Sequence, residues 1–387
     1  MKISKYLSLI FAAATLFVGC GNEEGENNNQ TGGGGKKSEP VITADNLSVV
    51  VNTPITFTVT LDGVDVTAES QIVVESHGFI KVENPYTPTV DGNYKFYAAV
   101  GEKKLLSNTI QVAVTPIPPA LPEDSDIANT AFNHRILLID HTGVKCQWCP
   151  TMMTALKEVA EETEKDYHSK YYEAMSHSFT GTDPAGSDAA YTVSGYFGVN
   201  NWPTLTYNFV HDITSSANSE HIKGQIDALW KESADASVAA SVAFAATSVV
   251  VTASVKAAVE NEYRINAWLL EDNIYAEQTG SATNVEDDWM DMHHNAIRQV
   301  ASANPISGFD LGTIKVGESA SQVMKLDIVK EKWNRENMKV MLIVSAKDSR
   351  GRFEVANVAI CPCPAADSFG VAESITYDYK SNETTEE

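Results

Sequence analysis

Alternating apolar and polar positions dominate the first third of the chain beyond its N-terminus. The alternation is clear in residues 55–60 and 94–98, which is the period of a half-buried strand. Asp-Gly pairs at 62–63 and 91–92 supply turn signals between such runs. Residues 41–115 are therefore predicted to form a β-sandwich.

The sequence of residues 91–94, Asp-Gly-Asn-Tyr, resembles the tyrosine corner of immunoglobulin-like sandwiches. The resemblance implies an immunoglobulin-like fold for residues 41–115. No cluster of chemically reactive side chains occurs in this region, so a spacer or a partner-binding module is expected. A proline-rich segment, residues 115–122, follows it as a semi-rigid linker.

Residues 127–233 change to a mixed pattern of strand and helix. The apolar run 136–139 predicts a buried strand, and Pro150 opens a helical pattern at a position where proline is well tolerated. A second strand is predicted near residues 171–177, and a later amphipathic helix near 222–230. This order is typical of an α/β unit.

Strand patterns return in residues 236–366, at 248–255, 263–270, 323–329 and 339–345. A C-terminal β-sandwich is predicted there. The alanine- and valine-rich stretch 238–258 is assigned to strands, although its composition also suits a helix. Residues 367–387 hold six acids and one lysine and are predicted to be a loose acidic tail.

The N-terminus has the pattern of an export signal. Lys2 and Lys5 precede the apolar run 6–18, and Cys20 follows a short segment that resembles a bacterial lipobox. Residues 1–19 are then the lipoprotein signal peptide, and residues 20–40 are a flexible tether with lipidated Cys20. An ordinary signal peptide with an incidental cysteine is the alternative.

Charge and hydropathy narrow the classes of partner. The 387 residues carry a formal net charge of -23, which disfavours nucleic acid, and no long apolar run follows the N-terminus. The protein is expected to attach to the membrane only through its lipid anchor. Acids at 23, 24 and 26 resemble the signal that sends Bacteroidetes lipoproteins to the outer leaflet of the outer membrane; a plain solvated linker is the alternative.

The sequence Cys146-Gln147-Trp148-Cys149 places two thiols between a predicted strand and a predicted helix. A helix N-terminus stabilises a thiolate, so this position suits thiol–disulfide exchange. Cys146 would attack and Cys149 would resolve the mixed disulfide. A static disulfide and, less readily, a metal site are the alternatives.

These cysteines and their surroundings resemble thioredoxin-like proteins. The resemblance implies that Asp140, six residues before Cys146, assists proton transfer, and that Trp202, Pro203 and Thr204 form a cis-proline loop that binds substrate. Lys145 before the first cysteine and Pro150 after the second depart from the usual pattern. The expected fold class is multidomain α+β, with a central thioredoxin-like α/β domain between two β-sandwiches.

A second thiol pair, Cys361 and Cys363, is separated by one proline. A structural role at a strand end, an electron relay with the first pair, and a zinc site with all four thiols are the alternatives. No resident metal or other cofactor is expected.

The arrangement is similar to Omp28-related outer-membrane proteins of Bacteroidetes. Residues 134–150, 196–204, 294–298 and 332–344 carry the similarity, which spans roughly residues 127–360. It implies a lipid-anchored outer-membrane protein. Thiol exchange on envelope or extracellular proteins is the first functional hypothesis, and a surface binding protein or adhesin with a structural CxxC disulfide is the second.

Overall fold

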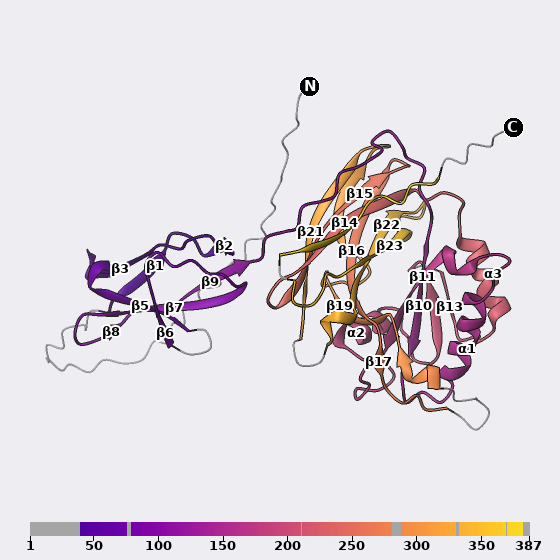
Figure 1. Ribbon diagram of the computed structural model, residues 1–387, viewed down its shortest axis with the longest axis horizontal. Helices are drawn as coiled ribbons and strands as arrows, with labels where there is room; N and C mark the ends of the chain where they lie inside the picture. The colour runs from indigo at the N-terminus through magenta and orange to yellow at the C-terminus, as the bar shows by residue number, and fades with distance from the viewer. Residues whose placement is uncertain are drawn as a thin grey trace, which may run out of the picture.

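The computed structural model describes residues 39–75, 79–209, 211–280, 288–329, 333–368 and 370–381. The predicted signal peptide and the predicted lipid site at Cys20 lie outside these described residues. Figure 1 shows a small N-terminal module at one end, joined through an extended segment to a larger body, which contains the three α-helices of the described residues.

The N-terminal module consists of a three-stranded and a six-stranded sheet. Alternate side chains point into one core between them, as in β3, where Phe57 and Val59 are buried while Thr58 is exposed. Tyr94 donates a hydrogen bond to the Val90 carbonyl at 2.8 Å, which closes the turn before its strand. The elements are β1 (Val41–Ala44), β2 (Ser48–Val50), β3 (Phe57–Leu61), β4 (Val64–Asp65), η1 (Thr67–Glu69), β5 (Ser70–Glu75), β6 (Phe79–Val82), β7 (Gly92–Val100), β8 (Leu105–Leu106) and β9 (Ile110–Thr115).

One nine-stranded sheet organises the body, with the path β13-β12-β10-β11-β19-β16-β22-β23 and with β20 beside β16. Strand β10 is parallel to β11 and antiparallel to β12, and β11 continues in parallel to β19. The strands are β10 (Ile136–Thr142), β11 (Tyr171–His177), β12 (Thr204–Tyr207), β13 (His211–Thr214), β16 (Asn261–Glu271), β19 (Ala296–Val300), β20 (Phe309–Ile314), β22 (Met338–Lys347) and β23 (Phe353–Pro362).

The two faces of this sheet are covered differently. Helices α1 (Cys149–Ala160) and α3 (Ser219–Leu229) pack on one face of its first strands, and α2 (Asp188–Tyr196) packs on the other. A four-stranded sheet covers the remaining strands, in the order β21-β15-β14-β24. No helix in the described part of the chain is both long and apolar enough to cross a membrane.

The strands of the smaller sheet are β14 (Ala236–Phe244), β15 (Ser248–Ala257), β21 (Ser319–Asp327) and β24 (Ala372–Ile375). Their bounds show that the alanine- and valine-rich stretch is a strand hairpin, as predicted. Short elements complete the body: η2 (Tyr167–Lys170), β17 (Ile274–Tyr275), η3 (Asp288–Asp291), β18 (Met292–His293) and η4 (Arg335–Asn337).

The predicted fold class, a central thioredoxin-like α/β domain between two separate β-sandwiches, is wrong. The chain is mostly β, and the strands of residues 127–233 do not form a sheet of their own. Strand β19, from the segment expected to be a separate sandwich, pairs with β11 and joins the two halves. One apolar cluster runs across the join, from Leu137 and Ile139 to Trp268 and Ile343, so no boundary near residue 235 separates two cores.

The segment expected to be a loose acidic tail is partly ordered. Strand β24 pairs with β14, and Tyr377 is buried beyond it. The physical reason is Lys256, whose side chain is buried and whose Nζ donates to Asp124 Oδ2 at 2.8 Å and to Tyr379 Oη at 2.8 Å. This buried ammonium group therefore holds the interdomain linker and the end of the chain against β15.

We expect Lys256→Met to destabilise the body by about 1–3 kcal/mol, because it removes the ammonium donor from Asp124, Tyr379 and two linker carbonyls. Urea denaturation should measure the loss, and hydrogen exchange should show faster opening near Tyr379. Lys325→Met is the matched control, because Lys325 pairs with Asp327 while exposed to solvent. Equal effects of the two substitutions would show that the buried contacts are not what holds the chain end.

Candidate functional site

Cys146 and Cys149 form a disulfide where β10 leads into α1. Cys146 lies in the turn, its amide donating to the Gly143 carbonyl at 3.0 Å, and Cys149 is the first residue of α1. Pro150 occupies the first turn of this helix, where its missing amide hydrogen costs nothing. The strand–turn–helix position predicted for the pair is present.

Both half-cystines are buried, with exposed fractions of 2% for Cys146 and 0% for Cys149. The attack predicted for Cys146 requires an exposed sulfur, whereas this residue is buried. Trp148, between the two cysteines, is the exposed residue of the motif, at 59%. A partner molecule can therefore reach the indole of Trp148 directly but not either sulfur atom.

Residues 276–279, here named the strap, lie against the turn that carries Cys146. The Gln278 side-chain amide donates to the carbonyls of Gly143 at 3.4 Å and Cys146 at 3.2 Å, and Thr279 donates its amide to the Val144 carbonyl at 2.7 Å. Gln278 is 2% exposed. The strap thus satisfies three carbonyls of the turn and fixes it in place.

A buried carboxylate and two imidazoles support the same turn. Asp183 Oδ2 accepts hydrogen bonds from the Val144 amide at 2.9 Å and from His177 Nδ1 at 3.0 Å. His293 Nε2 donates to the Ala276 carbonyl in the strap at 3.0 Å, and its ring meets that of His177 edge-on, with centroids 4.8 Å apart. Burial and the neighbouring His177 lower the pKa of His293 to about 4, so the His293 ring packs as a neutral group at pH 7.

Asp140 lies on β10 and is fully buried. Neither of its carboxylate oxygens has a hydrogen-bond partner among the residues that the structure describes. Burial, and then the nearby Glu173 carboxylate, raise the pKa of Asp140 well above its ordinary value. Burial also raises the pKa of Glu173, to about 7. A buried carboxyl group without a partner costs several kcal/mol, which makes Asp140 a candidate for function.

The peptide bond between Trp202 and Pro203 is cis. Thr204 pairs with His141 on β10, so this loop lies at the same end of the sheet as the turn that carries Cys146. Trp202 Nε1 donates to Ser178 Oγ at 3.1 Å, and the Ser178 hydroxyl is 2.7 Å from Ser194 Oγ. The loop is therefore held by a buried polar network, and Trp202 is half-buried while Pro203 and Thr204 are buried.

The second pair of cysteines differs from the first in its bonding and in its surroundings. Cys361 and Cys363 are both free, and Cys361 lies in the core between the two sheets of the body. Burial raises the pKa of Cys361 to about 12 and raises the pKa of Cys363 further, so neither is an active thiolate at pH 7. Within the described ranges, no group of three or more potential ligands could hold a metal ion.

Sequence reasoning missed the strap and the role of His293. Gln278 has no motif around it, and its contact with Cys146 joins positions that are 132 residues apart. Asp183 was visible only as part of an Asp-Pro pair near His177. These groups surround the disulfide through pairing between β17 and β18, which no local pattern encodes.

We expect Asp140→Asn to be more stable than the parent protein at pH 8 and nearly equal to it at pH 4. The raised pKa means that folding retains a proton which the unfolded chain releases above the ordinary aspartate pKa of 3.8. The free energy of unfolding that the Asp140 carboxyl takes from the parent protein grows by up to about 1.4 kcal/mol per pH unit, from pH 3.8 to the pKa of the folded state. Urea denaturation across this pH range measures it, with exposed Asp367→Asn as control. A variant less stable at every pH would contradict it.

Two comparisons with known proteins bear on this arrangement, and no curated protein sequence matches the chain. HBP35 of Porphyromonas gingivalis is similar in structure, with a TM-score of 0.50 at 14% identity, over 63% of this chain and 80% of that chain. At this identity the likeness concerns the fold alone. A family model, Outer membrane protein Omp28, matches residues 190–362, which include most of α2, the strap and most of the nine-stranded sheet. The resemblance predicted from the sequence is therefore confirmed over residues 190–362, which carry the pattern of the Omp28 family of outer membrane proteins.

Proposed function

We propose that this chain is a lipid-anchored binding protein of the outer membrane, in which the Cys146–Cys149 disulfide is a fixed structural clamp. The match to Omp28 supports the outer membrane as its location. The lipobox-like segment before Cys20 supports the anchor, although Cys20 lies outside the described residues. The acidic tether supports display at the cell surface, where partners would be extracellular or envelope components.

The observation that carries this proposal is the burial of the disulfide. Exchange requires a thiolate to attack one sulfur along the S–S axis, so the sulfur must be accessible. Cys146 is 2% exposed, and Gln278 bonds to its carbonyl. The strap, which His293 holds through the Ala276 carbonyl, and Asp183, which accepts from Val144, both fix the turn around this disulfide. An attacking thiol would therefore need local opening of the turn.

The disulfide instead has a clear structural role. It ties the end of β10 to the first residue of α1, and so fixes the angle at which the helix leaves the sheet. The ring that it closes is short, and a ring of four residues stabilises the folded state by about 2 kcal/mol through the entropy of the unfolded chain.

We expect reduction of the native disulfide by dithiothreitol to be slow and limited by local opening of the chain. Gln278→Ala should accelerate it several-fold, because the substitution removes two hydrogen bonds of the strap, while Gln322→Ala on exposed β21 should not. Trapping free thiols with iodoacetamide over time, followed by mass spectrometry, measures the rate. Reduction as fast as that of an exposed disulfide would rule out the clamp.

Thiol–disulfide exchange on envelope or extracellular proteins is the second candidate function. Asp140, buried without a partner near the end of β10, specifically favours it, because a structural role does not account for that cost. Cys146 would attack, Cys149 would resolve, and Asp140 would move the proton. Trp202, Pro203 and Thr204 would hold the substrate backbone.

Insulin reduction by the whole mature chain separates the two functions. The clamp predicts no turnover above the dithiothreitol background. Turnover that disappears in Cys146→Ser and falls in Asp140→Asn would establish exchange and remove the clamp.

Lipidation is tested independently. In cells fed tritiated palmitate, the parent chain should incorporate label and fractionate with the outer membrane. Cys20→Ala should lose both properties, whereas Cys361→Ala should keep them because Cys361 is buried in the body. Label retained by Cys20→Ala would contradict the anchor.

A further inference from the structure

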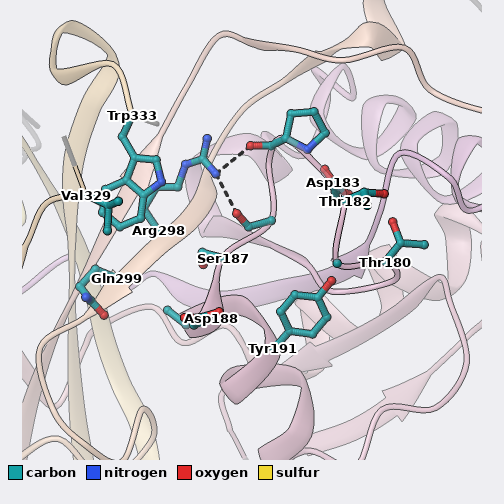
Figure 2. A pocket seen from close by; sticks show the side chains of 14 residues that line it. Thr180, Thr182, Asp183, Ser187, Asp188, Tyr191, Arg298, Gln299, Val329 and Trp333 are labelled. Atoms are coloured by element: carbon teal, nitrogen blue, oxygen red, sulfur yellow. Dashed lines mark hydrogen bonds between the residues drawn. The ribbon is translucent and has the colours of Figure 1, made fainter. Parts of the chain in front are cut away.

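A cavity of about 630 Å³ opens in the body where four segments meet. Figure 2 shows its walls, which come from the loop after β11, the start of α2, strand β19 and the chain beyond β21. Its volume lies in the range of pockets that hold small ligands. The cavity is separate from the disulfide, but Asp183 belongs to both: it lines one wall of the cavity and accepts a hydrogen bond from Val144 in the turn that carries Cys146.

Arg298 on β19 is the fixed polar group of this cavity. It is 3% exposed, its Nε bonds Glu271 Oε2 at 2.7 Å, and its Nη1 donates to the carbonyls of Pro184 at 3.0 Å and Gly186 at 3.1 Å (Figure 2). Within the described residues, Nη2 has no hydrogen-bond partner. Among the described residues Nη2 is not one of the buried atoms that lack a partner, and its hydrogens can be donated to a ligand that enters the cavity.

The charge of Arg298 is already neutralised. Glu271 is buried beside it, and its second oxygen accepts from the Asn334 amide at 2.9 Å. Arg298 therefore acts in the cavity as an oriented donor rather than as a site for an anion. Asp188, at the exposed start of α2, adds an acceptor with negative charge. This combination disfavours anionic ligands.

The other lining groups are polar and neutral, with one large aromatic. Thr180 Oγ1 is buried and has no partner in the described part of the chain. Tyr191 and Gln299 line the cavity, and the half-buried Trp333 forms its far wall in Figure 2. The Arg298 guanidinium lies 5.8 Å from the centroid of the Trp333 ring, which holds that indole in place.

We propose that this cavity binds a neutral saccharide. Sugar hydroxyl groups donate and accept at once, which matches donors on Arg298 and Gln299 and the acceptor on Asp188. The C–H face of a pyranose ring suits the Trp333 indole. This inference rests on the proposed binding function and names the class of ligand for it.

A peptide fits the same walls less well. Extended peptides bind mainly by pairing with a free strand edge. The strand that lines this cavity, β19, pairs with β16 on one side; on the other it pairs with β11 at Ala296, and its Ile297 carbonyl accepts from the Ser187 hydroxyl. The side chains that line the cavity suit recognition of a sugar better than they suit strand pairing with a peptide.

The test uses the whole mature chain and isothermal titration with maltotriose, cellotriose, mannotriose and N,N′-diacetylchitobiose. At least one should bind and should quench tryptophan fluorescence. Trp333→Ala should weaken that binding about tenfold or more, equivalent to about 1.4 kcal/mol. Gln299→Ala and Tyr191→Phe, which remove groups nearer the surface, should weaken it with the fold unchanged by circular dichroism.

Matched controls lie outside the cavity. Trp148→Ala beside the disulfide, Tyr196→Phe at the end of α2 and Gln322→Ala on β21 should leave saccharide affinity unchanged. No binding of any of the four sugars at about 10 mM, or binding that Gln299→Ala and Tyr191→Phe both leave intact, would overturn the assignment. Binding of a peptide that depends on Trp333, Gln299 and Tyr191, with no binding of any of the sugars, would also overturn it.

These outcomes separate the cavity from the proposed function. If the protein still attaches to a surface ligand in all three cavity variants and the disulfide is inert, the binding function is supported and the saccharide site is wrong. Insulin turnover without any ligand binding would remove both.

Discussion

The body of this protein depends on the pairing of one short strand, β19. It pairs with β11 in parallel at Ala296 and runs antiparallel to β16 on the other side, and this pairing unites two halves of the chain. The single apolar cluster that includes Leu137, Trp268 and Ile297 exists only because of this join. The same strand carries Arg298 into the cavity, so the fold of the body and the position of this arginine share one constraint.

The disulfide and the cavity lie on opposite sides of the loop between β11 and α2. Asp183, within that loop, accepts from Val144 in the cysteine turn and also lines the cavity. The turn is further held by Gln278 from the strap. A rigid, buried disulfide next to a pocket with an oriented arginine is an arrangement suited to holding a ligand in one geometry. Asp140 is the one group here that such a role does not explain.

Local patterns allowed much of the secondary structure to be predicted. The run 136–139 became β10, Pro150 lies at the start of α1, and the alanine-rich stretch formed β14 and β15. The fold class could not be predicted, because a thioredoxin-like resemblance around the cysteines says nothing of which distant strand extends the sheet. The burial of Cys146 was missed for the same reason, since Gln278 reaches it from far along the chain. The arginine of the cavity carries no sequence signal, because Glu271 and Pro184 are distant from it in sequence.

The ammonium group of Lys256 also has a consequence for the order in which the protein matures. Two of its partners are Asp124, made before it, and Tyr379, made 123 residues after it. A ribosome or an export channel delivers the chain from its N-terminus, so β15 cannot complete its polar contacts until Tyr379 has emerged. A nascent chain that has not yet reached Tyr379 would leave this cation without one of its partners. The polar contacts of this one side chain therefore need both the linker around Asp124 and the segment around Tyr379.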